Sequence, residues 1–375
     1  MNARSGPLHP PVAYGGADRW ILVSAALLVT LGTVMVLSTS YFQGHERFAS
    51  PYHFLWKHLL AVAVGTASLA LAARLPSALY RGLAYPLAGA TLILLAAVLV
   101  LPSHGAVARW IHAGSLSFQP SELAKVALVL FTARSVARDD DARPGVARPL
   151  VFGTLVIGLI GFEPDFGTAA VLGFALWAML FVARARWTQL GALAGLGVVA
   201  LATGVLFAAY RSDRIEVFLD PWQHRQGKGF QIVQSLLAFG AGGFTGVGLG
   251  AGQQKMFYLP AAHTDFIFAV MGEELGLCGT SLVLALFVVL GYRSLRIALG
   301  HPSCFGRLLA FGLTLVIVSQ AAVNMGVATA ILPTKGLSLP LLSYGGSGMV
   351  VTLACVGMLL SLSREMEGEV HVQRG

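Results

Sequence analysis

The chain has 375 residues, of which 56% are hydrophobic and only 11% charged. Ordinary soluble domains carry about 25% charged residues, and the mean hydropathy here is +0.74. Such a composition excludes a soluble globular protein, because the chain has too little polar surface to cover a core of this size.

Apolar runs close to the ~20 residues needed to cross ~30 Å of hydrocarbon recur along the whole chain. Two of them, 121–137 and 148–162, are short or charged at one end, and 265–292 carries acids. We predict an all-α polytopic membrane protein with about ten transmembrane helices. The predicted spans are 20–40, 54–73, 82–101, 121–137, 148–162, 167–182, 190–210, 265–292, 308–330 and 349–361.

Loop charges set the expected orientation, since cytoplasmic loops collect Lys and Arg. With ten spans and a cytoplasmic N-terminus, most arginines fall on the inner side, so the net charge of +8 does not indicate nucleic-acid binding. The expected parts are an inner tail (1–19), a transmembrane domain (20–364) and an inner C-terminal tail (365–375). The first run is expected to be a retained span, because no small-residue cleavage site follows it. One long extracytoplasmic loop, 211–262, joins the seventh and eighth spans.

Four connections on the predicted outer side are richer in Gly, Pro and polar residues than a connector requires. Residues 103–120 are too polar to span, and their aromatic content indicates a re-entrant or interfacial segment. Residues 163–167 form a tight turn with two acids, the 240–252 part of the long loop is dense in glycine, and 332–348 precedes the last span. Because these four lie on one side, a site would be assembled there.

The stretch 253–276 carries His263, Asp265, Glu273 and Glu274 in an apolar, helix-like run. A charge at the centre of a bilayer costs at least ~2.5 kcal/mol, so Asp265 is the first candidate for chemistry. The alternative is that Thr264 and Asp265 cap the start of a helix and complement its dipole. At 100° per residue Glu273 lies about 80° round the helix from Asp265 and Glu274 lies opposite. For both glutamates a structural ion pair is favoured over catalysis.

At these segments the chain resembles the SEDS family (shape, elongation, division and sporulation), which contains FtsW and RodA. The similarity runs in order from about Trp20 to Arg364, and LPTKGLSLP (332–340) is similar to the FtsW and sporulation branch, since RodA-like members usually lack the TKG. The other segments are ARWI (108–111), FQPSELAK (118–125), PDFGTA (164–169), FLDPW (218–222), QIVQSL (231–236), YLPAAHTDFIFA (258–269), GEELG (272–276) and LSYGGSG (342–348).

The resemblance implies a peptidoglycan glycosyltransferase that polymerises lipid II at the outer face of the cytoplasmic membrane. The 4-hydroxyl of the incoming GlcNAc attacks C1 of the strand's terminal MurNAc with inversion, and undecaprenyl pyrophosphate leaves. Pyrophosphate needs no general acid, so the usual carboxylate pair of glycoside chemistry reduces to one base. Asp265 matches the family's essential aspartate in HTDF and is expected to be that base.

The leaving pyrophosphate requires positive charge, for which a guanidinium offers a planar fork and Lys a point charge. Anchoring to lipid headgroups is the alternative role for every candidate. The candidate cations on the predicted outer side are Arg109, Arg211, Arg214, Lys255 and Lys335.

Several polar residues are expected to border the same cavity. Glu122 and Lys125 are spaced i, i+3 and can pair; whether they touch substrate or only hold the cavity together stays open. Asp165 is similar to an acidic position of the family, with a turn-forming role equally favoured. Ser343 and Ser347 in the glycine-rich segment are candidates for binding sugar or phosphate.

No tightly bound cofactor is predicted. A divalent cation such as Mg²⁺ or Mn²⁺ could bridge pyrophosphate oxygens and Asp265, because such ions keep most of their waters. The expected partners are lipid II, a class B penicillin-binding protein and other divisome or elongasome membrane proteins. The penicillin-binding protein would supply the transpeptidase nucleophile motif SxxK, which this chain lacks. The expected location is the division septum. The alternatives are a lipid II flippase, although no internal repeat typical of transporters is found, a RodA-like elongation polymerase, and a non-catalytic scaffold.

Overall fold

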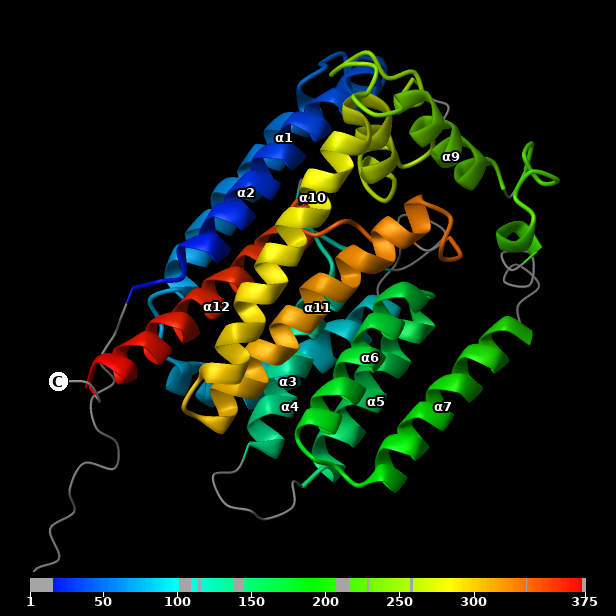
Figure 1. Cartoon of the computed structure of the whole chain (residues 1–375). Coiled ribbons are helices and arrows are strands. Elements are labelled where there is room, and N and C mark those ends of the chain that lie inside the picture. Colours follow the sequence, from blue (N-terminus) through cyan, green and yellow to red (C-terminus); the bar gives the residue numbers. More distant parts are fainter. Residues whose placement is uncertain are drawn as a thin grey trace, which may run out of the picture.

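The computed structural model describes residues 16–100, 109–113, 116–137, 145–206, 216–227, 229–256, 259–334 and 336–372. These residues form a bundle of helices with one short hairpin (Figure 1). The helices are α1 (Arg19–Phe48), α2 (His53–Ala72), α3 (Ser77–Val100), α4 (Pro120–Val136), α5 (Ala147–Phe162), α6 (Phe166–Val182), α7 (Trp187–Leu206), α9 (Phe230–Gly242), α10 (Ile267–Gly300), α11 (Cys304–Ala328) and α12 (Gly346–Val372).

The prediction of an all-α polytopic membrane protein is confirmed. Six described helices are long and apolar enough to cross a membrane, namely α1, α2, α3, α10, α11 and α12 over Gly346–Met366. The apolar helices α5, α6 and α9 and the Trp187–Val199 part of α7 are shorter. Each of the ten predicted runs falls on a helix, but ten crossings stay a prediction because α4 to α7 are short or carry charge.

Three boundaries differ from the predictions. Asp265 precedes α10 and does not lie inside it. Helix α12 runs to Val372, so the predicted tail 365–375 begins as helix. The long loop 211–262 contains the helix α9, which was not anticipated.

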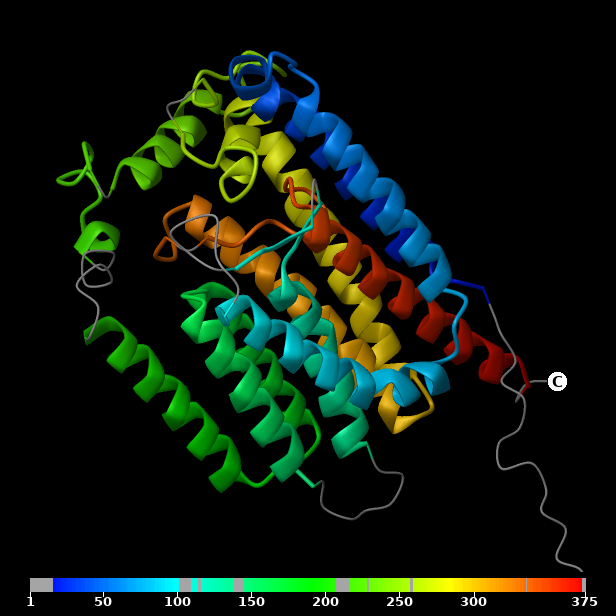
Figure 2. The same cartoon turned by 180° about the vertical axis from the view of Figure 1, so that it is seen from behind.

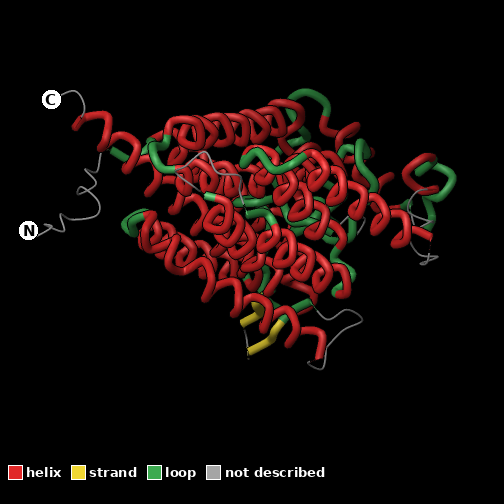
Figure 3. Tube along the Cα trace, turned by 90° about the horizontal axis from the view of Figure 1, so that it is seen from below, coloured by secondary structure: helices red, strands yellow, loops and turns green. Residues whose placement is uncertain are grey.

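The segment expected to be re-entrant or interfacial contains a two-stranded antiparallel hairpin. Strand β1 (Ile111–Ala113) pairs with β2 (Leu116–Phe118), with Ile111 opposite Phe118. Figure 3 shows these strands at the edge of the helical bundle. Residues 103–108 of the predicted segment lie outside the described part of the chain.

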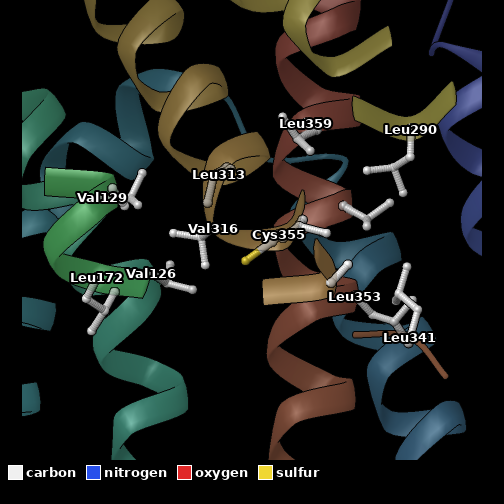
Figure 4. Packing of buried hydrophobic residues seen from close by; sticks show 14 of the residues in the cluster. Val126, Val129, Leu172, Leu290, Leu313, Val316, Leu341, Leu353, Cys355 and Leu359 are labelled. Atoms are coloured by element: carbon white, nitrogen blue, oxygen red, sulfur yellow. The ribbon is translucent and has the colours of Figure 1, made fainter. Parts of the chain in front are cut away.

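Helix α4 lies at the centre of the bundle, against α3, α5, α6 and α11. Every residue from 120 to 130 except Leu123 is buried, so this part of the helix meets protein on all sides although it carries two charges. Figure 4 shows Val126 and Val129 of α4 packed near side chains of α6, α11 and α12. Helix α7 touches chiefly α6 and lies at the margin of the bundle in both opposite views (Figure 1, Figure 2).

Residues from connections distant in sequence meet at one end of the bundle. The Tyr344 amide donates to the His263 carbonyl over 2.9 Å, and Arg109 Nε donates to the Glu163 carbonyl over 2.8 Å. We call this end, with residues 162–166, 261–266 and 337–346, the site end. At the opposite end the Asp18 amide donates to Ser363 Oγ, which ties the start of α1 to α12.

Candidate functional site

The backbone around Asp265 is held from two sides. Asn324 of α11 donates through Nδ2 to the Asp265 carbonyl over 2.8 Å and to the Leu337 carbonyl over 2.5 Å. Ser343 Oγ donates to the Thr264 carbonyl over 2.6 Å. These bonds fix the segment before α10 between α11 and residues 337–346, so Asp265 is placed by tertiary contacts and not by a helix.

The Asp265 carboxylate is partly exposed and receives no hydrogen bond from the described residues. The N-cap of α10 is Phe266, and no side chain caps that helix. The structure therefore gives no support to the capping alternative for Thr264 and Asp265. A Cβ at Gly336 would lie 3.1 Å from Asp265 Oδ2, so glycine there keeps the side of the carboxylate clear.

The pKa of Asp265 is raised to about 6, chiefly by burial and also by the negative charge of Asp165, and Arg109 opposes both effects. The three side chains thus share one electrostatic environment although they come from three connections. A carboxyl group with a pKa near neutrality is suited to accept a proton at physiological pH.

Asp165 caps α6, in agreement with the turn-forming alternative. Its Oδ1 accepts from the Thr168 amide at 3.1 Å and its Oδ2 accepts from Thr168 Oγ1 at 2.8 Å. Both oxygens are therefore engaged, and the side chain is buried. Asp165 acts on Asp265 through its negative charge, which raises the pKa of Asp265.

Arg109 bridges the hairpin segment and the turn between α5 and α6. Its Nε donates to the Glu163 carbonyl at 2.8 Å and its Nη2 to the Pro164 carbonyl at 2.5 Å. A guanidinium has five N–H donors, so donors remain for a ligand. The side chain is half-buried, which keeps those donors within reach of the site end.

Glu163 is a site residue that the sequence reasoning missed. Its side chain is buried, and neither carboxyl oxygen has a hydrogen-bond partner among the described residues. Burial raises its pKa to about 8, with Asp165 adding to the shift and Arg109 opposing it. The signal was present in the sequence, because two acids in one tight turn before an apolar helix are costly.

Glu122 and Lys125 form the predicted i, i+3 ion pair at 2.7 Å, and both are buried. Lys125 Nζ also donates to Gln320 Oε1 at 2.7 Å, and Gln320 Nε2 donates to the Ser338 carbonyl at 2.9 Å. The network joins α4 to α11 and to the site end. Gln320 and Asn324, four residues apart in an apolar helix, were also missed; their polarity inside a span was the available signal.

The two candidate serines hold backbone in place. Ser343 Oγ accepts from the Leu339 amide at 2.8 Å as well as donating to the Thr264 carbonyl. Ser347 Oγ accepts from the Gln119 amide at 3.2 Å. Both side chains are buried, and their binding to sugar or phosphate stays a prediction.

His263 packs in a ring cluster that supports the segment carrying Asp265. Its ring centroid lies 5.2 Å from that of Phe54 and 5.6 Å from that of Tyr344. Burial lowers the pKa of His263 to about 4, so the imidazole is neutral at pH 7. It adds no positive charge beside Asp265.

Lys255 lies apart from the other site candidates. Its side chain is buried, and Nζ is 2.6 Å from Glu274 Oε1. The structural ion pair expected for Glu274 is confirmed, but Glu273 accepts backbone amides of Gln253 and Gln254 and has no ion pair among the described residues. We leave Lys255 out of the site, because its charge is compensated and has no access to a ligand.

The candidate cations Arg211, Arg214 and Lys335 lie outside the described residues. Within the described ranges no group of three or more His, Cys, Asp or Glu side chains could hold a metal ion. The site end therefore brings together Asp265, Asp165, Arg109 and Glu163, with the Glu122–Lys125 pair behind them.

Comparison with known proteins identifies the family. The family model FTSW_RODA_SPOVE, described as a cell cycle protein, matches residues 18–368. The probable peptidoglycan glycosyltransferase FtsW of Geobacter sp. (strain M18) is 40% identical over 366 residues, covering 94% of this chain and 98% of that protein. The corresponding protein of Coxiella burnetii (strain RSA 493 / Nine Mile phase I) is 37% identical, covering 93% and 97%.

Solved structures share the fold. A chain from a peptidoglycan synthase complex, described as coordinating polymerization and crosslinking, matches with a TM-score of 0.76 and 34% identity over 93% of this chain and 98% of that one. The rod shape determining protein RodA of Thermus thermophilus matches with a TM-score of 0.70 and 31% identity, covering 93% and 97%. This chain therefore belongs to the FtsW/RodA/SpoVE family of cell cycle proteins.

Proposed function

We propose that this protein is a peptidoglycan glycosyltransferase that polymerises lipid II, with Asp265 as its general base. The observation that carries the proposal is Asp265, a partly exposed residue whose carboxylate receives no hydrogen bond from the described residues and whose pKa burial raises to about 6. Relatives named as probable peptidoglycan glycosyltransferases support the same reaction class.

In this reaction the 4-hydroxyl of the incoming GlcNAc attacks C1 of the strand's terminal MurNAc, and Asp265 accepts the hydroxyl proton. The C1–O bond to undecaprenyl pyrophosphate breaks, and the bonding electrons leave with the pyrophosphate. At pH 7 a carboxyl with a pKa near 6 is about tenfold more ionised than protonated. It is also a stronger base than an ordinary carboxylate, so position and basicity favour the same role.

Arg109 is the proposed partner of the leaving group. Its backbone contacts fix the guanidinium, and its remaining N–H donors suit phosphate oxygens. Glu163, whose pKa is about 8, is largely neutral at pH 7. A neutral Glu163 leaves the charge of Arg109 uncompensated from that side, so the cation stays available to pyrophosphate.

The site offers a divalent cation one available carboxylate. Asp265 offers a carboxylate without a hydrogen bond, whereas both oxygens of Asp165 are engaged with Thr168. Mg²⁺ or Mn²⁺ is commonly held by one or two carboxylates plus substrate phosphates. Asp265 would hold the ion, which would neutralise charge on the pyrophosphate; we expect no tight binding without substrate.

We further propose ten membrane crossings, with the site end outside and both termini in the cytoplasm. The opposite end of the bundle is rich in arginine, as expected for a cytoplasmic side. The described arginines at or near that end are Arg19, Arg74, Arg81, Arg134, Arg148, Arg184, Arg186, Arg293, Arg296, Arg307 and Arg364.

The partner we propose is a class B penicillin-binding protein, which would supply the cross-linking step that this chain has no SxxK motif to perform. A similar chain belongs to a peptidoglycan synthase complex, which supports such an assembly. Similarity to proteins named FtsW and the TKG segment favour a role in division at the septum over elongation.

The test incubates the purified protein, alone and with its partner, with labelled lipid II and compares wild type with Asp265→Asn. We expect glycan strands from wild type and almost none from the variant. If the variant polymerises at the normal rate, Asp265 is not the base. If neither protein makes polymer while liposomes containing wild type translocate lipid II, the flippase alternative is correct.

A further inference from the structure

Helix α10 is interrupted at Gly276, whose backbone has φ +63° and ψ −160°. In an unbroken helix the amides of Leu277 and Cys278 would donate to the carbonyls of Glu273 and Glu274, four residues earlier. Here they donate to the carbonyls of residues 243 and 244, at 3.0 and 3.1 Å. The break therefore lies about two and a half turns into a helix that begins two residues after Asp265.

The long loop occupies this break. The amides of Val247 and Gly248 donate to the carbonyls of Glu273 and Glu274, each over 3.0 Å. Two helical hydrogen bonds are thus replaced by four bonds to an inserted strip of chain, and the polar backbone stays satisfied at a depth where an open break would be costly. We call residues 243–256 the wedge. Figure 1 shows the chain between α9 and α10 turning back against the first turns of α10.

Glycine is required at both surfaces of the insertion. A Cβ at Gly246 would collide with the Glu274 carbonyl, and a Cβ at Gly276 would collide with the Gly246 amide. Both residues also have positive φ, which side chains rarely tolerate. Close approach to α10 therefore accounts for Gly242, Gly246 and Gly252, whereas Gly243, Gly248 and Gly250 adopt positive φ.

The side chains of the two glutamates then fix the wedge. Glu273 Oε1 accepts from the Gln253 amide at 2.8 Å. Glu274 Oε2 accepts from the Gly250 amide at 3.1 Å, and its Oε1 accepts from Lys255 Nζ at 2.6 Å. These buried side chains therefore join residues 250–255 of the wedge to α10.

Helix α1 completes this cluster. Ser38 Oγ donates to Glu274 Oε1 at 2.7 Å and accepts from Lys255 Nζ at 2.8 Å. The exposed fraction of the side chain is 2% for Lys255 and 0% for Glu274. We call Ser38, Lys255 and Glu274 the latch, since together they tie the wedge to α10 and to α1.

We propose that the wedge and latch position Asp265 for glycosyl transfer. The first part of α10, Ile267 to Leu275, begins two residues after Asp265 and is joined to the rest of the helix through the wedge, so its direction depends on how the wedge is seated. Ser38, Lys255 and Glu274 are positioning residues, because they act through this half-helix and do not touch the reacting atoms. The inference rests on the proposed function of Asp265.

The test uses the full-length protein in nanodiscs and compares Lys255→Met, Glu274→Gln and the double variant, with Ser38→Ala as a milder change. The matched control is Arg293→Gln. Arg293 lies on the same helix, α10, beyond the break, and the substitution removes its ion pair with Asp18. Two readouts are taken: amide hydrogen exchange at residues 247, 248, 277 and 278, and kcat and KM for lipid II polymerisation.

We expect each single latch variant at Lys255 or Glu274 to speed exchange at these four amides at least tenfold and to lower kcat at least tenfold, with KM within twofold of wild type. Removing one partner leaves a buried charge unpaired, whereas removing both is often tolerated, so the double variant should recover most of kcat. Ser38→Ala should shift both readouts in the same direction by a smaller factor, and Arg293→Gln should change neither.

Three results would overturn the proposal. Faster exchange with an unchanged kcat would mean that the wedge does not position Asp265. An equal loss of kcat in Arg293→Gln would mean that general destabilisation of α10 explains the effect. A rise in KM with constant kcat would place the latch in substrate binding. Wild type that makes no polymer would instead refute the proposed function itself, which the exchange data alone cannot do.

Discussion

The surroundings of Asp265 and the latch both contain acids and a cation in or beside the start of α10, yet their partners differ. In the latch, Glu274 accepts from Lys255, from Ser38 and from a backbone amide. At the site end, Asp265 accepts no hydrogen bond from the described residues, and among those same residues Arg109 donates to the carbonyl oxygens of Glu163 and Pro164. Charged groups whose hydrogen-bonding atoms are all engaged within the protein hold its structure. Charged groups with unused donors or acceptors are available to a ligand.

The largest expected effect comes from removing the free carboxylate. Asp265→Asn should lower kcat by about 10²–10⁴, the usual contribution of a general base. Because the Asp265 side chain makes no hydrogen bond to the described residues, the melting temperature should stay close to that of wild type. Polymerisation of labelled lipid II and a thermal melt measure the two quantities, and a large fall in melting temperature would contradict the comparison.

Arg109 tests the cationic side of the same site. Arg109→Gln should lower kcat/KM about 10- to 100-fold, since a hydrogen bond to a charged group contributes ~1.5–3 kcal/mol and ~1.4 kcal/mol is tenfold. Arg109→Lys keeps the charge but loses the planar fork, and should fall between wild type and Arg109→Gln. Equal activity of Arg109→Lys and Arg109→Gln would show that the positive charge by itself contributes nothing and that the planar fork accounts for the loss.

The pH dependence should reveal both raised pKa values. Asp265 must be deprotonated to act as a base, so kcat/KM should fall about tenfold per pH unit below its pKa of about 6. Above about pH 8 Glu163 ionises, its charge offsets that of Arg109, and activity should decline again. Glu163→Gln should remove the alkaline decline and leave the acid limb in place, which a pH–rate profile of both proteins measures.

The smallest expected effect is a shift of that acid limb. Asp165→Asn removes a negative charge that raises the pKa of Asp265, so the acid limb should move to lower pH. Asparagine caps helices about as well as aspartate, so the stability of α6 should change little. An unchanged acid limb in this variant would show that Asp165 does not act on Asp265 through its charge.

Much of the fold was predictable because the membrane imposes it. Each of the ten apolar runs corresponds to a helix, and the described parts of the four polar connections lie at one end of the bundle. Which side of the membrane that end faces stays a prediction. The i, i+3 pairing of Glu122 with Lys125 and the structural role of Glu274 were also predictable, since both follow from helical spacing and from the cost of a charge in an apolar segment.

The partners of individual residues were not predictable. Lys255 had the same sequence signal as Arg109, a basic residue on the outer side, but lies buried against Glu274. Glu163 was passed over although its carboxyl has no hydrogen-bond partner among the described residues. The helix α9 and the insertion of the wedge into α10 depend on contacts between segments more than twenty residues apart.

The sequence by itself determined that this is a helical membrane protein of the FtsW/RodA/SpoVE family and that Asp265 is its first candidate for chemistry, because hydropathy and charge cost act locally along the chain. Only the tertiary structure decided which of the ionisable residues keep donors or acceptors that a ligand can use. That distinction depends on burial and on partners brought from distant segments, since the pKa of a carboxyl and the contacts of a lysine are properties of the surrounding space. Within the stretch 253–276, Asp265 is left open to a ligand while Glu273, Glu274 and Lys255 are used to hold the chain.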